Sequence, residues 1–345
     1  MQFHHFLGKK NRRRCYIAFH YSNIFIKMEA IAIIDTGYES YKYEHELFNS
    51  ASYRLDIYQG DPSDIAAKAR FCKNASGILV RGTRVDKKFM EHTPTLRAIS
   101  RYGSGYENID LEEASKRDIK VANVQGYGNH SVSDHAIALI YACSRSLIQG
   151  VKSLHPEFGK PPSPDIFEFH DKTLGIIGLG RIGSHLAMKA VTLFDKIVAC
   201  DPYVTESKFK AYKAVKCSLP ELLEKSHVIS IHCNLTPETH HMINTASFSE
   251  MKNRPVVINT ARGSIIDSGA LVAALENNSV HSAGIDVFET EPPGKDQDIL
   301  INHHRVIATG HYAWYSDSAS GELQKRASDN LLAMLRGEKI PDGLN

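Results

Sequence analysis

The stretch Gly175-Ile-Ile-Gly-Leu-Gly-Arg-Ile-Gly183 decides the fold class of this chain. Its spaced glycines stand between an apolar run at 173–177, which is typical of a strand, and a run at 185–194, which is typical of a helix. A strand, a glycine-rich turn and a helix in this order are the opening of a dinucleotide-binding unit. The alternative is an ordinary glycine-rich turn with no ligand.

Each glycine of this fingerprint has a separate task in a dinucleotide site. Gly178 gives the tight turn, Gly180 lets the backbone approach the pyrophosphate, and Gly183 lets the helix pack on the strand. The helix expected at 185–194 would present its N-terminus to the pyrophosphate charge.

Asp201 indicates which dinucleotide binds. It follows a second strand expected at 196–200, where a carboxylate can accept hydrogen bonds from both ribose hydroxyls but would repel a 2′-phosphate. Pro202 and Tyr203 come next, so no Arg stands beside the carboxylate to bind that phosphate. The sequence therefore favours NAD over NADP. The alternative is an Asp that caps a turn before Pro202.

The composition indicates a soluble globular protein of two domains, since the chain has 345 residues, of which 42% are hydrophobic. Its six cysteines show neither a C-x-x-C pair nor zinc-like spacing, which predicts free thiols and a cytoplasmic location. The adjacent pairs His4-His5 and His240-His241 do not point together as metal ligands do, so no metal site is expected.

The charge is unevenly distributed. Residues 1–27 contain no acid and six basic side chains, Lys9, Lys10, Arg12, Arg13, Arg14 and Lys27. We expect a disordered extension there, with a basic anchor as the alternative. The rest of the chain carries 35 basic against 39 acidic residues, which argues against nucleic-acid binding. No run approaches the roughly 18 apolar residues of a membrane span, so no membrane partner is expected.

From residue 28 onward, strand-like and helix-like segments alternate, as in an α/β protein. The first unit is expected to have strands at 30–35, 77–80, 96–101 and 119–123. The second unit is expected to have strands at 173–177, 196–200, 228–232, 256–259, 283–286 and 305–308. One long helix is expected over 129–147 and another over 318–337.

The last helix follows the final strand of the second unit and is expected to pack back on the first unit. This predicts two doubly wound parallel-sheet domains, with a Rossmann nucleotide domain inserted into a flavodoxin-like substrate domain. The substrate domain would comprise 28–125 and 315–345, and the NAD-binding domain 126–314. Two crossings of the chain would form a hinge over a cleft.

Three polar residues follow strands of the nucleotide unit, where a doubly wound fold binds its ligands: Arg262, Glu291 and His311. An Arg fork can hold a carboxylate, and a His can exchange the proton of the neighbouring hydroxyl while hydride moves to a nicotinamide. A Glu beside that His would stabilise the imidazolium. Taken singly, they could equally be an ion-paired Arg, a solvated loop charge and a core histidine.

These residues resemble the D-isomer-specific 2-hydroxyacid dehydrogenases, and the similarity extends from Met28 onward. The motifs that carry it, besides the glycine fingerprint, are Arg101-Tyr-Gly-Ser-Gly-Tyr-Glu-Asn-Ile-Asp110, His232-Cys-Asn-Leu-Thr236, Asn259-Thr-Ala-Arg-Gly263 and Asp286-Val-Phe-Glu-Thr-Glu-Pro292. Other segments look like the C-terminal-binding-protein branch, namely His240-His-Met-Ile-Asn244, Ala313-Trp-Tyr-Ser316 and Ile340-Pro-Asp342. The phosphoglycerate dehydrogenase-like proteins are similar as well.

The resemblance implies a role for each matched position. Arg262, Glu291 and His311 match the catalytic residues. The implied cofactor-binding residues are Gly178, Gly180, Arg181, Ile182, Gly183, Asp201, His232, Asn234, Thr260, Ala261, Asp286 and His311. The implied substrate-binding residues are Arg81, Gly82, Ser104, Gly105, Arg262 and Trp314.

The expected function is NAD-dependent transfer of hydride between NADH and a small 2-keto acid, giving the D-2-hydroxy acid. The resemblance leaves open a glyoxylate or hydroxypyruvate reductase and a protein similar to D-3-phosphoglycerate dehydrogenase. It also implies a homodimer. The rival from another class is an NAD(H)-gated dimeric binding protein of the corepressor type with weak catalysis.

Overall fold

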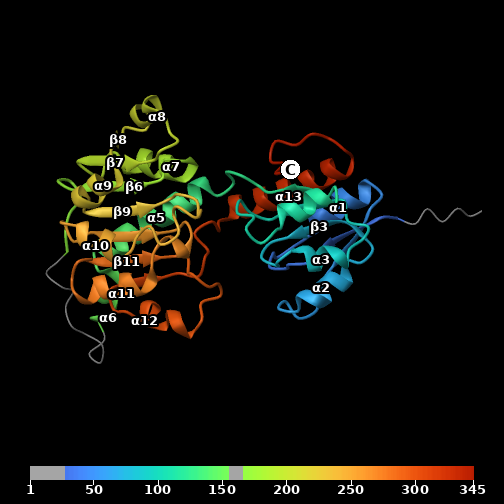
Figure 1. Ribbon diagram of the computed structural model, residues 1–345, viewed down its shortest axis with the longest axis horizontal. Helices are drawn as coiled ribbons and strands as arrows, with labels where there is room; N and C mark the ends of the chain where they lie inside the picture. Colours follow the sequence, from blue (N-terminus) through green and yellow to red (C-terminus); the bar gives the residue numbers. More distant parts are fainter. Residues whose placement is uncertain (1–27, 155–165) are drawn as a thin grey trace, which may run out of the picture.

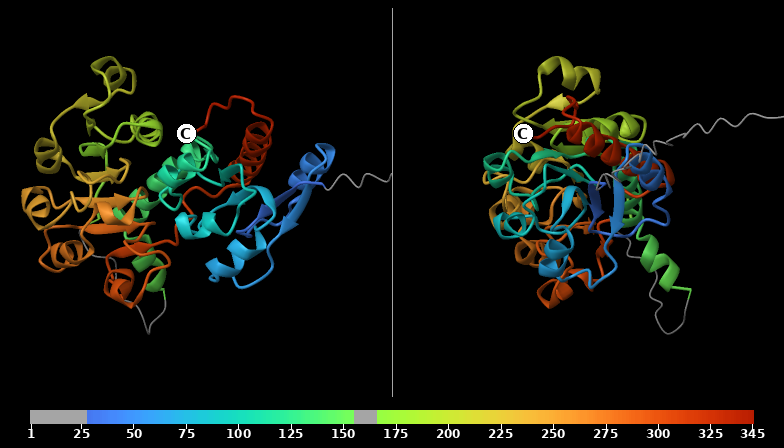
Figure 2. Two further views of the ribbon diagram at one scale, coloured as in Figure 1. Left: turned by 45° about the vertical axis from the view of Figure 1, so that its right-hand side comes forward. Right: turned by 90° about the vertical axis from the view of Figure 1, so that its right-hand side faces the viewer.

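The computed structural model describes residues 28–154 and 166–345. The basic segment 1–27 lies outside the described residues. Two lobes are visible in Figures 1 and 2, each built on a parallel sheet, and we refer to them as the first and second lobe. None of the helices in the described ranges is both long and apolar enough to cross a membrane.

The first lobe contains a five-stranded sheet in the order β2-β1-β3-β4-β5, with parallel pairing throughout. This is the flavodoxin-like order. Its strands are β1 (Ala30–Ile33), β2 (Arg54–Ile57), β3 (Ala75–Val80), β4 (Ala98–Arg101) and β5 (Lys120–Ala122). The helices between them are α1 (Lys42–Ser50), α2 (Ile65–Phe71), α3 (Lys87–Glu91) and α4 (Leu111–Lys116).

The second lobe contains a seven-stranded parallel sheet in the order β12-β11-β10-β9-β6-β7-β8, which is the Rossmann order with one further edge strand. Its strands are β6 (Thr173–Ile177), β7 (Lys196–Cys200), β8 (Val215–Lys216), β9 (Val228–Ile231), β10 (Val256–Asn259), β11 (Ser282–Ile285) and β12 (Val306–Ala308). Its helices are α7 (Arg181–Ala190), α8 (Glu206–Ala211), α9 (Leu219–Lys225), α10 (Thr245–Glu250), α11 (Ser268–Glu276) and α12 (Asp298–Ile301).

The C-terminal helix belongs to the first lobe. Figure 1 shows α13 (Asp317–Leu335), in red, over the sheet formed by the blue N-terminal strands. Its Leu331 and Leu335 are buried in one apolar cluster with Ile31 and Leu79 of the sheet. Beyond the helix, Gly343 forms an antiparallel bridge with Ala122 of β5. The second lobe is therefore inserted between two parts of the first, and the predicted fold class is confirmed.

Two local expectations were wrong. The helix expected over 129–147 is interrupted: α5 (Asn129–Ser144) ends before Ser146, whose φ of +48° is left-handed, and α6 (Leu147–Lys152) begins after it. Each sheet has one edge strand that was not expected, β2 in the first and the two-residue β8 in the second, and their charged and exposed residues hide the strand signal.

The topology explains where a site can form. All strands of a parallel sheet end at one edge, so the loops after β3 and β4 and those after β10, β11 and β12 are brought together within each lobe. Residues from both sets of loops line a single cavity between the lobes.

Candidate active site

The cavity between the lobes has a volume of about 380 Å³. The first lobe contributes four predicted substrate-binding residues to its lining, Arg81, Gly82, Ser104 and Gly105. The second lobe and the segment before α13 contribute Ile182, Thr260, Arg262, Asp286, Glu291, His311 and Trp314. The fold thus collects in one place residues that lie more than 200 positions apart in the sequence.

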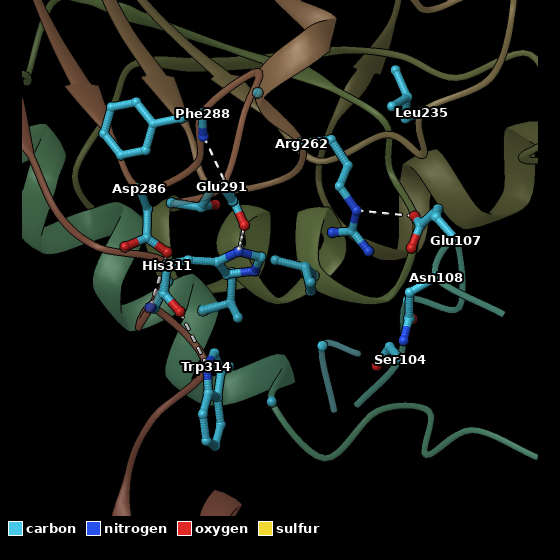
Figure 3. A pocket seen from close by; sticks show the side chains of 18 of the residues that line it. Ser104, Glu107, Asn108, Leu235, Arg262, Asp286, Phe288, Glu291, His311 and Trp314 are labelled. Carbon is cyan, nitrogen blue, oxygen red and sulfur yellow. Dashed lines mark hydrogen bonds and ion pairs between the residues drawn. The ribbon is translucent and has the colours of Figure 1, made fainter. Parts of the chain in front are cut away.

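Glu291 and His311 form a tight pair. His311 Nδ1 lies 2.5 Å from Glu291 Oε2, and Glu291 Oε1 accepts a hydrogen bond of 3.1 Å from the N–H of Phe288 (Figure 3). Burial alone would raise the pKa of Glu291, but the hydrogen bond and charge of His311 outweigh it and leave that pKa below its ordinary value. Because Glu291 occupies Nδ1, the Nε2 atom of His311 is the one available to a ligand.

The turn that carries His311 is held by Asp286, which is fully buried at the end of β11. The Asp286 carboxylate accepts hydrogen bonds from Thr309 Oγ1 at 2.5 Å, Ala313 N at 3.0 Å and Tyr312 N at 3.2 Å. The N–H of His311 also donates to the Asp286 carbonyl at 2.7 Å. Asp286 lines the cavity, but its carboxylate is used by the protein itself.

Arg262 follows β10 and bridges the two lobes. Its Nε donates to Glu107 Oε1 of the first lobe at 3.0 Å, and its Nη1 donates to the carbonyl of Ala261 at 2.7 Å. Its Nη2 faces Gly105 so closely that a Cβ on that glycine would lie 2.3 Å away. The guanidinium therefore keeps N–H groups for an anion in the cavity, and Figure 3 shows it across from His311.

The fingerprint turn fits a dinucleotide. Gly178 has a φ of +90°, and a Cβ there would lie 2.6 Å from the backbone N of Cys233. A Cβ on Gly183 would lie 2.1 Å from the carbonyl O of Gly178, so the helix packs directly on the turn. At Gly180 a Cβ would meet nothing within 4 Å, which leaves open space at the N-terminus of α7 for a pyrophosphate.

Of three other predicted cofactor residues, Asp201 and Arg181 form hydrogen bonds within the protein and Asn234 is exposed. Asp201 accepts hydrogen bonds from Leu179 N at 2.8 Å and from Tyr203 N at 2.9 Å, so it supports the fingerprint turn. Arg181 donates to the side chain of Gln125 in the first lobe. Asn234 is exposed.

Three more predicted cofactor residues lie around the ends of β9 and β10. His232 Nε2 pairs with Ser230 Oγ at 2.8 Å, and burial lowers the pKa of His232 to about 3, so its ring is neutral near pH 7. Its Nδ1 is buried without a partner, as is Thr260 Oγ1. The N–H of Ala261 donates to Asn259 Oδ1 at 3.0 Å.

Gly82, a predicted substrate-binding residue, has its backbone N–H engaged within the protein. It lines the cavity, but its N–H donates at 2.8 Å to Oδ2 of Asp35, which is not part of the cavity lining. Its backbone is therefore not an available donor to a substrate.

Several lining residues were missed. They include Arg101, Glu107, Asn108, Tyr127 and Phe288. The first three lie in the motif quoted for the resemblance, so the signal was present although only Ser104 and Gly105 were chosen from it. Burial lowers the pKa of the Arg101 guanidinium, and its Nε has no hydrogen-bond partner. Within 28–154 and 166–345, no group of three or more His, Cys, Asp or Glu side chains is arranged to hold a metal.

Comparison with known proteins gives one consistent result. The profile of the D-isomer specific 2-hydroxyacid dehydrogenase NAD binding domain matches residues 137–313. The glyoxylate reductase of Korarchaeum cryptofilum is 34% identical over 301 residues, which cover 85% of this chain and 90% of that protein. The D-3-phosphoglycerate dehydrogenase of Mycobacterium leprae is 32% identical over 272 residues, covering 79% of this chain and 51% of that protein, or about half its length.

A solved structure agrees with these sequence matches. The crystal structure of D-lactate dehydrogenase from Aquifex aeolicus, complexed with NAD and lactic acid, has a TM-score of 0.78 at 29% identity and covers 90% of this chain and 96% of that one. The chain therefore belongs to the D-isomer specific 2-hydroxyacid dehydrogenase family and is an NAD-dependent oxidoreductase that acts on a CH–OH group.

Proposed function

We propose that this chain reduces a small 2-keto acid to the D-2-hydroxy acid with NADH. The observation that carries the proposal is the Glu291–His311 pair, which shares one cavity of about 380 Å³ with Arg262. That volume is at the lower end of the range for small-molecule sites, which suits a compact substrate.

The residues divide the chemistry as follows. NADH, when bound at the fingerprint turn, supplies the hydride. The free N–H groups of Arg262 bind the substrate carboxylate and orient the adjacent oxo group. His311 Nε2 donates a proton to the oxo oxygen as the negative charge develops there. Glu291, held by the N–H of Phe288, keeps the imidazole oriented through its contact with Nδ1.

A second candidate substrate class has its own support. Arg81 and the partly buried Arg101 both line the cavity, and neither guanidinium forms a hydrogen bond with a side chain in the described ranges. A 2-keto acid with a phosphate or second carboxylate would satisfy them. The relatives include a D-3-phosphoglycerate dehydrogenase, whose name indicates a substrate with a phosphate, and a glyoxylate reductase, whose name indicates a substrate without one.

We also propose the roles of the lobes and their assembly. Residues 28–125 and 315–345 would bind the substrate, and 126–314 would bind NAD. A homodimer is supported by α6, where Leu147, Ile148 and Val151 are 51%, 43% and 62% exposed on one short helix. The cytoplasm is the proposed compartment, since Cys72, Cys143, Cys200, Cys217 and Cys233 are all free thiols.

The proposed reaction is tested by mixing the purified protein with NADH and glyoxylate, hydroxypyruvate, pyruvate or phosphohydroxypyruvate. Loss of absorbance at the nicotinamide band reports turnover. Rapid oxidation with one of these acids is expected. Tight NADH binding with negligible oxidation across the panel would contradict the proposal and favour the gated binding protein.

Replacing His311 by Gln should lower kcat by a factor of about 10² to 10⁴, because the proton donor is lost while the side-chain size is kept. The dissociation constant for NADH, measured by fluorescence titration, should change little. His45, which is exposed on α1 and does not line the cavity, provides the matched control as His45→Gln. A near-normal rate in His311→Gln would remove His311 from the reaction.

Replacing Asp201 by Ala should narrow the preference for NADH over NADPH, since the charge that repels a 2′-phosphate is removed. Some loss of affinity for both cofactors is also expected, because Leu179 N loses its acceptor. Asp201→Asn keeps an acceptor for that N–H and isolates the effect of the charge. The ratio of kcat/KM for the two cofactors is the measurement, and an unchanged ratio in both variants would discredit the ribose role.

Replacing Arg101 by Met should raise the KM for phosphohydroxypyruvate by about 10- to 100-fold, the value of one charge-assisted hydrogen bond. The KM for glyoxylate should stay nearly constant. Arg97→Met in the same strand region, where Arg97 pairs with Glu29 on the surface, serves as the control. Equal effects on both substrates would count against a second anionic group.

A further inference from the structure

One carboxylate outside the cavity holds the backbone of the loop that follows β3. Asp35, which follows β1 closely, accepts three hydrogen bonds at Oδ2, from Arg81 N at 2.8 Å, Gly82 N at 2.8 Å and Thr83 N at 2.9 Å. Three successive amides that converge on a single oxygen leave this loop little conformational freedom. The loop is the one that delivers Arg81 to the cavity lining.

The other oxygen of Asp35 is also fully engaged. Oδ1 accepts hydrogen bonds from Lys68 Nζ at 2.7 Å and from Thr83 Oγ1 at 2.5 Å. The side chain of Lys68, on α2, is only 3% exposed, and that of Asp35 is 12% exposed. A buried ion pair of this kind tolerates the loss of one partner poorly, because the remaining charge stays in a poorly solvated site.

The network keeps Asp35 charged. Burial by itself would raise the pKa of this carboxyl group, but Lys68, Thr83 and the loop amides together lower it to about 2. The carboxylate is thus an acceptor throughout the neutral range.

The Arg81 side chain also passes close to Gly37, two residues after Asp35. Its Nη1 passes so close to Gly37 that a Cβ on that glycine would lie 3.1 Å away, and Gly37 has a φ of +141° that side chains rarely adopt. The guanidinium has no hydrogen bond to a side chain in the described part of the protein. The backbone from which this side chain extends into the cavity is held by the hydrogen bonds of residues 81–83 to Asp35.

We propose that Asp35 is a positioning residue for substrate binding, which acts by fixing loop 81–83 so that the Arg81 guanidinium is presented to the anionic substrate. The inference rests on the function proposed above. Because all three loop amides are used by Asp35, the loop binds the substrate through the Arg81 side chain and not through its backbone.

The test compares Asp35→Asn with the unmodified chain in steady-state reduction of the panel acid that turns over fastest. Asn retains one acceptor oxygen but loses the charge and the second acceptor. We expect the KM for the acid to rise roughly tenfold while kcat changes little, as a misplaced binding group predicts. The Kd of oxamate for the NADH complex should rise in parallel, and the Kd of NADH should not change.

A double variant separates positioning from mere loss of stability. If Asp35 acts through Arg81, Asp35→Asn should add nothing to the KM of Arg81→Met, whereas independent effects would multiply. Asp110→Asn is the matched control, since Asp110 caps α4 in the same lobe through Glu113 N at 2.9 Å and does not line the cavity. Its KM should equal that of the unmodified chain.

Thr83→Val keeps the test decisive if Asp35→Asn does not fold, because it removes only the Thr83 Oγ1 contacts and preserves the ion pair. A smaller increase of the same KM is expected. An unchanged KM in the folded variants, or a double variant in which the two effects on KM multiply, overturns the inference. The proposed function still stands in that case if the unmodified chain reduces one of the panel acids. A chain that reduces no panel acid overturns both.

Discussion

The buried carboxylate of Asp286 is the constraint on which the site depends. A charge with no solvent exposure is stable only when donors surround it, and here the donors come from the turn after β12. That requirement fixes the turn against the end of β11 and places His311, in a left-handed conformation with φ of +55°, beside Glu291. The short contact between His311 and Glu291 thus follows from the hydrogen bonds that the Asp286 carboxylate accepts from this turn.

The two lobes contribute different charges to the cavity. The second lobe supplies the oriented His311 and the carboxylates that hold it, and the first lobe supplies Arg81 and Arg101. Arg262 links the charged residues of the two lobes, because it follows β10 of the second lobe and donates a hydrogen bond to Glu107 of the first. Burial would raise the pKa of Glu107, but the Arg262 charge and hydrogen bond lower it below its ordinary value, so the link is an ion pair at neutral pH. The arginines give the substrate side a positive field that suits a small anion.

Much of this arrangement was predictable from the sequence. The fingerprint glycines, the strands around them and the polar residues after β10, β11 and β12 follow from local patterns, because parallel strands end at a common edge. The insertion of the second lobe was predicted because the C-terminal helix follows the last strand of the second unit and was therefore expected to pack on the first.

Other features depend on contacts between distant segments, which no local pattern encodes. Arg101 and Glu107 lie in a recognised motif, but their place in the cavity lining depends on the second lobe, where Arg262 contacts Glu107. Gly82 is on the lining, yet its N–H donates to Asp35, which follows β1 and is 47 residues away in the sequence. The break at Ser146 depends on a single left-handed residue in an otherwise helical pattern.

The central claim is that Arg262 and His311 act on the two ends of one 2-keto acid. The most direct measurement is a crystal structure of the chain with NADH and oxamate, an unreactive analogue of such an acid. The account predicts the oxamate carboxylate on Arg262 and its oxo oxygen within hydrogen-bond distance of His311 Nε2, with the Glu291 contact intact. A carboxylate bound away from Arg262, or an oxo group out of reach of His311, would contradict it.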